Sequence, residues 1–450
     1  MMVKNNRRDF IKKTVTGATA LSLGGILPGF SSKSYTSIMG ANERILVGMM
    51  GVNSRGLQLS NIFARQKECE IIYVSDVDTR AAAKCIDSVE KLQNKRPKAA
   101  PDFRKALDDK QLDAMVIAVP DHWHAPAAIL ASKAGKHVYL EKPCSHNPNE
   151  GELLVAANKK YKNVIQMGNQ RRSFPNIIAA IEELHAGAIG RVYFAKTWYN
   201  DARPSIGRGK EIAVPSWLDY DLWQGPAPRK PYKDNVVHYN WHWFWHWGTG
   251  ESLNNGTHFV DLARWGLNVD YPVRVSSSGG RFHYQDDQET PDTQVITMEF
   301  NNKTSMAWEG RSCNGYPTEG RAVGVIFYGD KGTLSIAENT YKIFDLANKL
   351  IKDVNNKSEV ETNAINRSNP SPGGDVLHVL NFFDGIKNGA ILHADILGGH
   401  QSTLLVQLGN IALRSGNTLN LDPTNGHIKD DPGALNYWSR EYQPGWEPEI

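Results

Sequence analysis

The sequence contains few cysteines and no pair of them in a CxxC spacing. Its 450 residues include only Cys69, Cys85, Cys144 and Cys313. A CxxC redox motif is therefore absent. In an oxidising periplasm Cys69 and Cys85 could form a disulfide, but we expect the cysteines to be buried free thiols.

No charge of one sign dominates the chain. The formal net charge is +3 at pH 7, and residues 1–35 carry six Lys and Arg against one acidic residue, so the remainder is near −2. Without a basic stripe, nucleic acid is not expected as a partner. The apolar content of 40% and the length indicate a globular protein of two domains or one large one.

Long apolar runs are also absent. The nearest approach, Thr14–Phe30, contains several Gly and Thr residues and is too short and weak for a membrane span, so none is expected in the mature form. It follows Asn6-Arg7-Arg8-Asp9-Phe10-Ile11, and a twin arginine before a moderately hydrophobic stretch is typical of a Tat secretion signal. We therefore expect a signal peptide at 1–35 and a periplasmic protein; the alternative is a frayed basic N-terminus.

The next segment has the order of a dinucleotide-binding unit. Residues 44–51 form an apolar run that ends in Gly51, a helical pattern covers 57–66, and a second strand at 70–76 ends in Asp76. Gly51 would allow the tight turn, Gly56 would let the helix pack against the strand, and the helix N-terminus would face a pyrophosphate. Asp76 would bind the ribose hydroxyls and repel a ribose phosphate, which favours NAD over NADP. The expected cofactor-binding residues of this loop are Gly51, Asn53, Ser54, Arg55, Gly56 and Asp76.

Asn53 departs from the fingerprint, which has a glycine at that position. Asparagine tolerates left-handed backbone angles better than most residues. Its side chain could still crowd the pyrophosphate, so the motif depends on the strand before it and on Asp76 after it.

Two further strands are expected at 112–120 and 136–143, with a helix at 125–135 between them. The first ends in Pro120 and Asp121-His122-Trp123-His124, and the second in Glu141-Lys142-Pro143. The carboxyl ends of strands in an open α/β sheet line the ligand crevice. We therefore expect Pro120, His124, Glu141 and Lys142 beside the cofactor; a surface ion pair is the alternative for Glu141-Lys142.

Two segments, Ala118-Val-Pro-Asp-His-Trp-His124 and Gly135-Lys-His-Val-Tyr-Leu-Glu-Lys-Pro143, resemble the Gfo/Idh/MocA oxidoreductases. The resemblance runs from about Arg44 to Pro423. It implies an α/β fold with an N-terminal Rossmann domain, a doubly wound parallel sheet, at 41–165. It also implies an α+β domain with a large, open, mostly antiparallel sheet at 166–423, followed by a tail at 424–450.

The resemblance also implies roles for single residues. Lys142 would hydrogen-bond the reacting hydroxyl and the catalytic base, and Gln170 would lie beside the nicotinamide and the sugar. Strands at 191–199, 273–277, 292–300, 305–309 and 322–328 would form the second sheet. One face of that sheet often packs against another subunit in the family, which implies a homo-oligomer.

The aromatic segment Asn240–Trp247 alternates four tryptophans with His242, Phe244 and His246. Indole rings stack on pyranose rings, so a sugar platform is one interpretation. Packing in the core or between subunits is the other, and we expect it for at least half of these tryptophans. The spacing of His238, His242 and His246 would form a metal face on a helix, but the alternating tryptophans argue against a helix, so no metal is expected.

The segment 248–265 carries the candidate proton-transfer residues. On one helix, Asn254, His258 and Asp261 would share a face. His258 can take a hydroxyl proton while a hydride leaves the same carbon; a capping or solvent-bridging histidine is the alternative. Many members of the family that this chain resembles have Asp at the position of Asn254. An amide cannot stabilise a protonated His258 by charge, so either Asp261 or Glu251 supplies that negative charge or the base is weaker. The expected catalytic residues are Lys142, Asn254 and His258.

These observations predict an NAD-dependent oxidoreductase that acts on a CH–OH group of a sugar. The export signal and the sugar-type family place it, as an expectation, in the breakdown of exogenous polysaccharide. A tightly held cofactor is expected, because free NAD is scarce outside the cytoplasm. Two alternatives stay open: an NAD-dependent glycosidase that oxidises its substrate transiently, and a protein that binds NAD or sugar without catalysis. Arg171, Arg172, Arg203 and Arg208 could receive an acidic sugar, although surface ion pairing explains them as well.

Overall fold

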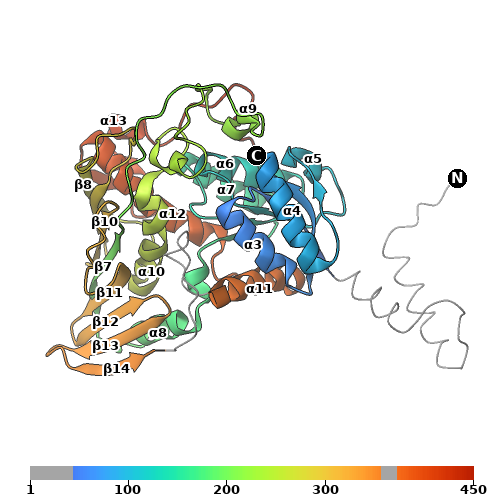
Figure 1. The fold of residues 1–450 in the computed structure, drawn as a ribbon. Helices are drawn as coiled ribbons and strands as arrows, with labels where there is room; N and C mark the ends of the chain where they lie inside the picture. The colour runs from blue at the N-terminus through green and yellow to red at the C-terminus, as the bar shows by residue number, and fades with distance from the viewer. Residues whose placement is uncertain (1–43, 356–371) are drawn as a thin grey trace, which may run out of the picture. The chain divides into compact units, whose positions relative to one another are not determined.

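The computed structural model describes residues 44–355 and 372–450. The unit Ile45–Ile450 is compact and holds the elements discussed below (Figure 1). The expected signal at 1–35 lies outside the described residues. The division of the chain into domains at 41–165 and 166–423 stays a prediction.

The first sheet contains six parallel strands, as expected for a Rossmann domain. Short, buried, apolar segments form it in the order β3-β2-β1-β4-β5-β6, which is the strand order of a dinucleotide-binding fold. The strands are β1 (Ile45–Met50), β2 (Cys69–Ser75), β3 (Lys98–Ala99), β4 (Ala114–Ile117), β5 (His137–Leu140) and β6 (Ile165–Met167).

Helices cover both faces of this sheet. One face packs against α3 (Ser54–Ala64), α4 (Thr79–Gln93) and α11 (Pro372–Asn388), and the other against α5 (Phe103–Leu107), α6 (Asp121–Lys133) and α7 (Pro148–Tyr161). Helix α11 comes from far along the chain, yet Val379, Phe382 and Phe383 are buried in the same core as Phe63. The ring centroids of Phe63 and Phe383 are 5.5 Å apart. Late residues therefore complete the core of the first sheet.

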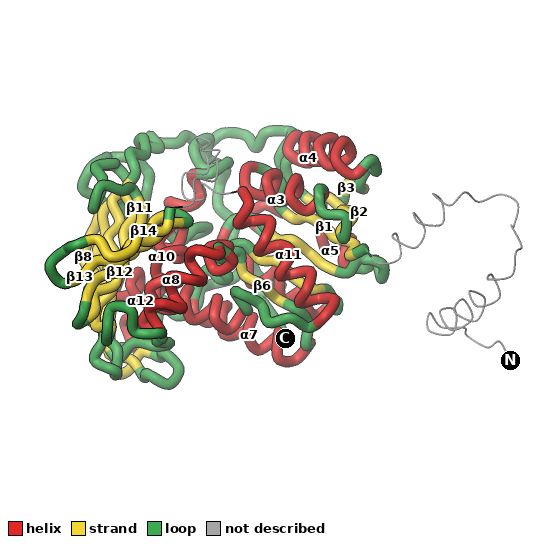
Figure 2. The backbone as a smooth tube through the Cα atoms, turned by 90° about the horizontal axis from the view of Figure 1, so that it is seen from below, coloured by secondary structure: helices red, strands yellow, loops and turns green. Residues whose placement is uncertain are grey.

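The second sheet is large, open and mostly antiparallel, which confirms the predicted fold class. Its ten strands have the order β14-β13-β12-β11-β7-β10-β9-β8-β15-β16, and β7 and β10 are its parallel pair. Helices α8 (Pro175–His185), α10 (Thr257–Leu267) and α12 (Ile396–Ser415) lie against one face (Figure 2). The strands are β7 (Val192–Asn200), β8 (Arg274–Gly280), β9 (Thr293–Glu299), β10 (Ser305–Arg311), β11 (Val323–Gly329), β12 (Gly332–Ala337), β13 (Thr340–Asp345), β14 (Leu350–Val354), β15 (Leu419–Leu421) and β16 (Ile428–Lys429).

Several element boundaries differ from the expectation. Helix α6 already begins at Asp121, so Asp121–His124 form its first turn rather than the end of a strand; Pro120 precedes it, and an acidic first turn complements the helix dipole. The expected helix around Asn254 begins with a π-helical segment at Ser252–Gly256 before α10. The remaining short elements are η1 (Gln170–Ser173), α9 (Tyr220–Gln224), η2 (Asn240–Trp243) and α13 (Pro432–Leu435).

The cysteines and the surface fit the composition. All four cysteines are free, and Cys69, Cys85 and Cys144 are buried, as predicted.

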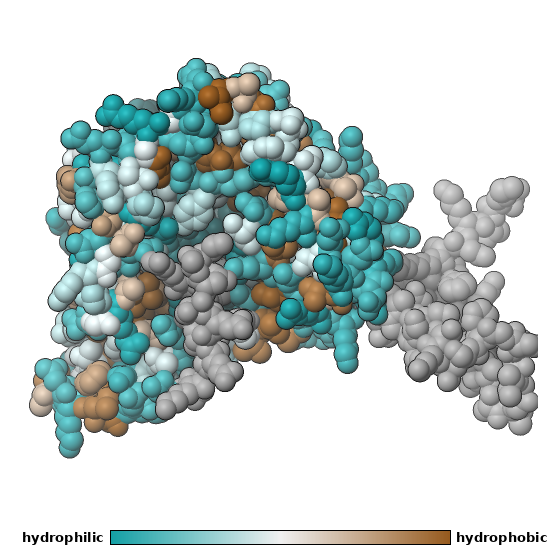
Figure 3. Space-filling model, in the orientation of Figure 1, coloured by the Kyte–Doolittle hydropathy of each residue, from teal (hydrophilic) through white to brown (hydrophobic). Residues whose placement is uncertain are grey.

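Within residues 44–355 and 372–450, no helix is long and apolar enough to cross a membrane. On the face in Figure 3, hydrophobic side chains form small groups among hydrophilic ones.

Candidate active site

A cavity of about 550 Å³ is lined by residues from both sheets' domains. It brings together every predicted site residue except Gly56. Those lining it are Gly51, Asn53, Ser54, Arg55, Asp76, Pro120, His124, Glu141, Lys142, Gln170, Asn254 and His258. Residues separated by some 200 positions in the chain therefore meet in one space.

The turn between β1 and α3 forms one wall. Gly51 has φ +76°, and a Cβ there would lie 2.5 Å from the Ala118 carbonyl oxygen, so the turn requires glycine. Asn53 is extended, with φ −79° and ψ 165°, so its tolerance of left-handed angles is not used. Because α3 begins beside the cavity, the first N–H groups of this helix are suited to bind an anion.

Gly56 has a packing role and does not line the cavity. A Cβ at this position would lie 1.8 Å from the Gly51 carbonyl oxygen. Its backbone N–H donates to the Asn53 carbonyl at 2.9 Å. Gly56 thus permits the close approach of helix and strand that the sequence analysis assigned to it, without reaching a ligand itself.

Asp76 stands at the end of β2 and is oriented by the backbone. Its Oδ2 accepts from the Val52 N–H at 2.7 Å, and its Oδ1 accepts from the Asp78 N–H at 2.9 Å. Burial raises the pKa of this carboxyl, while the two backbone hydrogen bonds lower it. A carboxylate fixed next to a helix N-terminus is suited to ribose hydroxyls.

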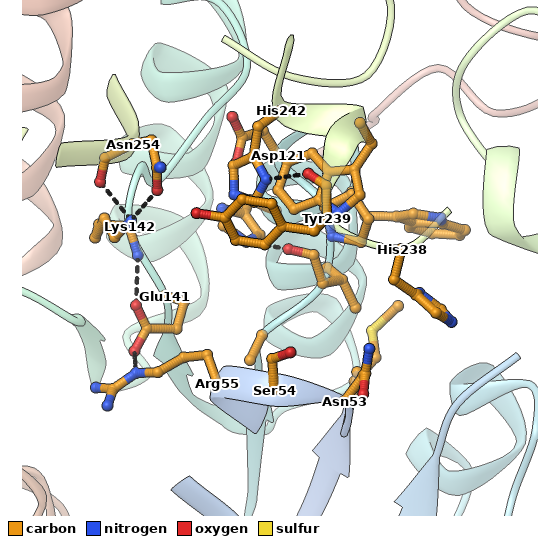
Figure 4. A pocket seen from close by; sticks show the side chains of 18 of the residues that line it. Asn53, Ser54, Arg55, Asp121, Glu141, Lys142, His238, Tyr239, His242 and Asn254 are labelled. Atoms are coloured by element: carbon orange, nitrogen blue, oxygen red, sulfur yellow. Dashed lines mark hydrogen bonds and ion pairs between the residues drawn. The ribbon is translucent and has the colours of Figure 1, made fainter. Parts of the chain in front are cut away.

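A buried ion network supports the floor of the cavity. Arg55 Nε donates to Glu141 Oε1 at 2.8 Å, and its two terminal nitrogens bind both Asp375 oxygens at 3.0 and 2.8 Å. Desolvation alone would lower the pKa of Arg55, but these two carboxylates raise it well above its usual value. The network ties α3, the end of β5 and α11 together, as Figure 4 shows for Arg55 and Glu141.

Lys142 follows Glu141 and points toward the second domain (Figure 4). Its Nζ donates to the Asn254 backbone oxygen at 2.6 Å and to Asn254 Oδ1 at 3.1 Å. Burial lowers its pKa. The π-helical segment thus occurs where a side chain from the other domain uses a backbone carbonyl, and such segments are frequent at functional sites.

His258 is buried near the start of α10, and 4% of its surface is exposed. Desolvation, followed by the charges of Lys142 and Arg171, lowers its pKa well below 6.5. Its Nδ1 is buried and has no hydrogen-bond partner in the described part of the chain. A neutral imidazole in this position can accept a proton at pH 7.

Asp261 does not supply a charge to His258. Its two oxygens are used by Arg172 Nε at 2.7 Å and by Ser402 Oγ at 2.6 Å. Asp261 also lies outside the cavity lining. The π-helical segment changes the spacing between Asn254 and α10, so Asn254 does not share the regular α-helical face that the sequence predicted with His258 and Asp261.

The cavity also contains Tyr199 and Tyr239, for which the sequence predicted no role, together with Asp121, Arg203 and His238, which the sequence analysis had noted without placing them among the site residues. Arg203 Nε donates to Glu251 Oε2 at 2.6 Å, so the one arginine of the four sugar candidates that reaches the cavity is already paired. Thr249 Oγ1 donates to Asp121 Oδ2. Tyr199 lies on β7, whereas Arg203 and Tyr239 lie between regular elements, and none of the three belongs to a local motif, so no spacing in the sequence could have placed them in the cavity.

The aromatic segment is mainly packing. Of its four tryptophans, Trp241 lines the cavity, whereas Trp243 and Trp247 are buried in the protein and Trp245 is half-buried outside the cavity. The three histidines bind separate partners: His238 contacts Asp78, His242 the Tyr239 carbonyl and His246 the Pro228 carbonyl. Among the described residues, no group of three His, Cys, Asp or Glu could hold a metal ion.

Family models match most of the chain. Residues 45–169 match the NAD-binding Rossmann fold, and residues 206–447 match the C-terminal alpha/beta domain, of one oxidoreductase family. The first described domain is therefore an NAD-binding Rossmann domain.

Curated relatives align over shorter stretches. A "Glycosyl hydrolase family 109 protein" of Saccharopolyspora erythraea is 28% identical over 44% of this chain and 46% of its own length. An inositol 2-dehydrogenase of Rubrobacter xylanophilus is 29% identical over 41% of this chain and 52% of its own length. The chain thus spans about half the length of these relatives.

Solved structures show the same fold over the complete relative. Levoglucosan dehydrogenase in complex with NADH superposes with a TM-score of 0.66 at 16% identity, covering 84% of this chain and 99% of that chain. An aldose-aldose oxidoreductase from Caulobacter crescentus gives 0.64 at 15% identity, covering 84% and 100%.

Proposed function

This chain belongs to the Gfo/Idh/MocA oxidoreductase family, and on that premise we propose that it is an NAD(H)-dependent oxidoreductase acting on a CH–OH group of a sugar or sugar derivative. One observation carries the proposal. The cavity that holds the dinucleotide-binding turn and Asp76 also holds Lys142, Asn254 and His258. Cofactor and proton-transfer residues therefore share one space.

The residues present fit NAD. The Gly51 turn leaves no room for a side chain, the N-terminus of α3 adjoins the cavity, and Asp76 is held by two backbone N–H groups. A carboxylate at this place would repel a ribose phosphate, which supports NAD over NADP. When bound, NAD supplies the hydride acceptor.

The chain's own groups would handle the proton. Lys142 carries three donors on Nζ; two go to Asn254, which leaves one for the substrate hydroxyl. His258 is the candidate acceptor of the hydroxyl proton as the C–H bond breaks; burial keeps its imidazole in the neutral form that can accept a proton, and the same burial makes it a weaker base. Asn254 positions Lys142, and proximity supplies a large part of the acceleration.

The cellular setting forms part of the proposal. We propose export to the periplasm by the twin-arginine signal at 1–35, with the cofactor held tightly, and a role in carbohydrate catabolism. A homo-oligomer formed through the outer face of the ten-stranded sheet is proposed as well, supported by alternating exposed residues on β9 such as Val295 and Thr297.

A second candidate is a redox-neutral glycosidase that oxidises its substrate transiently. The likeness to a glycosyl hydrolase family 109 protein favours it. In that case the bound cofactor returns to its starting state after each turnover. The glycosidic bond is cleaved, and no reduced cofactor accumulates.

The test is an absorbance spectrum of the purified folded protein before and after addition of mono- and oligosaccharides, including uronic acids. Bound nucleotide with a sugar-dependent rise at about 340 nm, where reduced nicotinamide absorbs, supports the dehydrogenase. Bound NAD with sugar cleavage and no lasting rise supports the glycosidase. Failure to bind NAD even when it is supplied would contradict both and leave a binding protein without catalysis.

A further inference from the structure

Two tyrosines of the cavity wall share one arginine. Arg203 donates from Nη2 to Tyr199 Oη at 3.0 Å and from Nη1 to Tyr239 Oη at 2.7 Å. Its Nε binds Glu251, so the guanidinium is fixed and its charge is balanced. Both phenols therefore act as acceptors toward Arg203, and each has one proton left to donate.

The two phenol protons differ in their use. Tyr199 Oη donates to Asp201 Oδ2 at 3.0 Å. For Tyr239, no acceptor is found within residues 44–355 and 372–450, and the Asn254 side chain is a further donor to its oxygen. The hydroxyl proton of Tyr239 is thus available to a ligand in the cavity that both tyrosines line.

The backbone holds Tyr239 in a conformation that bulky residues avoid. Its φ is +78° and its ψ is −50°, and the Asn240 N–H donates to the His238 carbonyl at 3.1 Å, which closes a three-residue γ-turn. Such strain is retained when the surroundings fix it, and it clusters at functional sites. Here His238 Nε2 contacts Asp78 at 2.9 Å, and His242 Nδ1 contacts the Tyr239 carbonyl at 2.6 Å.

The amide of Asn254 connects this tyrosine to Lys142. Asn254 Oδ1 accepts from Lys142 Nζ, so its Nδ2 faces Glu251 and the Tyr239 phenol. A carboxylate at position 254 could accept from Lys142 but could not donate to either neighbour, and it would place a second negative charge beside Glu251. Asparagine at this position therefore fits the surrounding donors and acceptors.

We propose that Tyr239 is a further substrate-binding residue, whose hydroxyl donates a hydrogen bond to a sugar oxygen neighbouring the one held by Lys142. The inference rests on the proposed function, because it takes a polyhydroxylated substrate as the occupant. Asn254 contacts both donors, so Lys142 Nζ and the Tyr239 phenol lie in the same part of the cavity, within reach of one polyhydroxylated ligand. Arg203 and Asn254 fix the phenol oxygen so that its proton faces the ligand.

The experiment compares Tyr239→Phe with the matched control Tyr199→Phe. The control also removes a hydroxyl that accepts from Arg203, but the proton of that hydroxyl is donated to Asp201 and not to a ligand. D-glucose, D-glucuronate, myo-inositol and levoglucosan are first screened for a thermal shift of the NADH-loaded wild type. The strongest binder and its monodeoxy analogues are then measured for binding and for turnover with NAD. We expect Tyr239→Phe to weaken sugar binding about 10-fold, which corresponds to one hydrogen bond of about 1.4 kcal/mol.

The deoxy analogues give a readout that a structural role would not move. Wild type and Tyr199→Phe should discriminate against loss of one particular hydroxyl, whereas Tyr239→Phe should accept that analogue and the parent sugar equally, with unchanged NADH affinity. Unchanged discrimination in Tyr239→Phe, or equal losses in both variants, would overturn the proposal. Sugar binding without turnover in wild type would contradict the proposed function while the binding comparison still tests Tyr239; the absence of binding by all four sugars would overturn both.

Discussion

The two sides of the cavity are built in different ways. On the cofactor side, the backbone shapes the binding turn and orients its acidic residue. The groups are a left-handed glycine, the start of α3, and two N–H groups that donate to Asp76. On the substrate side, side chains from different segments of the chain bind one another, as Arg203 does with Glu251, Tyr199 and Tyr239. Backbone sites depend on local order in the sequence, whereas side-chain networks depend on how distant segments meet.

This difference predicts that substitutions will separate into two classes. Changes on the substrate side should lower turnover and leave NADH affinity unchanged. Changes on the cofactor side should lower NADH affinity first.

The largest effect is expected at the candidate base. Replacing His258 by Asn removes the proton acceptor and should lower kcat by about 10²–10⁴-fold. NADH binding, followed by fluorescence titration, should stay within experimental error. His185→Asn, an exposed histidine at the end of α8, is the control. A His258→Asn enzyme with wild-type kcat would remove this residue from the mechanism.

The next effect concerns the turn below the cofactor. Gly56→Ala places a Cβ against the Gly51 carbonyl and should abolish measurable NADH binding or folding, because neither backbone segment can yield. Gly315→Ala is the control, since a Cβ there meets no atom closer than 3.5 Å. Circular dichroism separates loss of fold from loss of binding. Normal NADH affinity in Gly56→Ala would contradict the close packing of this turn.

A smaller effect is expected at Asp76. Asp76→Ala removes the candidate ribose acceptor and should weaken NADH binding by about 10–100-fold, the range for hydrogen bonds to a charged group. Affinity for NADPH should rise relative to NADH, because the repulsive carboxylate is gone. Calorimetric titration with both nucleotides measures the ratio. An unchanged ratio would show that Asp76 does not select the cofactor.

The first sheet and its signature residues could be predicted because their reasons are local. The Gly51 turn, the buried strands and the charged strand ends follow one another within about a hundred residues. The role of Asp261 could not be predicted, since its partners Arg172 and Ser402 lie on other elements. The position of Tyr239 likewise depends on a strained turn held by Asp78 of the first domain, which no periodicity in the sequence encodes.

A further prediction concerns the stability of the folded protein in acid, where no ligand is involved. Burial lowers the pKa of His378 and of His400 to about 4, whereas an unfolded histidine titrates near 6.5. The unfolded state therefore binds protons first as pH falls, and the free energy of unfolding should be full above pH 6.5 and decrease between pH 6.5 and about 4, by about 1.4 kcal/mol per pH unit for each histidine. Urea unfolding at several pH values measures how the free energy of unfolding changes with pH. His378→Gln should lower that slope by about 1.4 kcal/mol per pH unit, the contribution of one proton. A slope that does not change in His378→Gln would contradict the assignment.

Helix α11 has a consequence for how the protein is made. The ribosome releases residues 45–169 long before Val379, Phe382 and Phe383, which fill the core of the first sheet, and before Asp375, which pairs with Arg55. A nascent chain at that stage exposes the apolar faces of Phe63 and Tyr139 and leaves the arginine beside the cofactor turn without its bidentate partner. The dinucleotide site is therefore completed only near the end of synthesis, and a fragment cut after residue 169 should aggregate rather than fold as an independent NAD-binding domain.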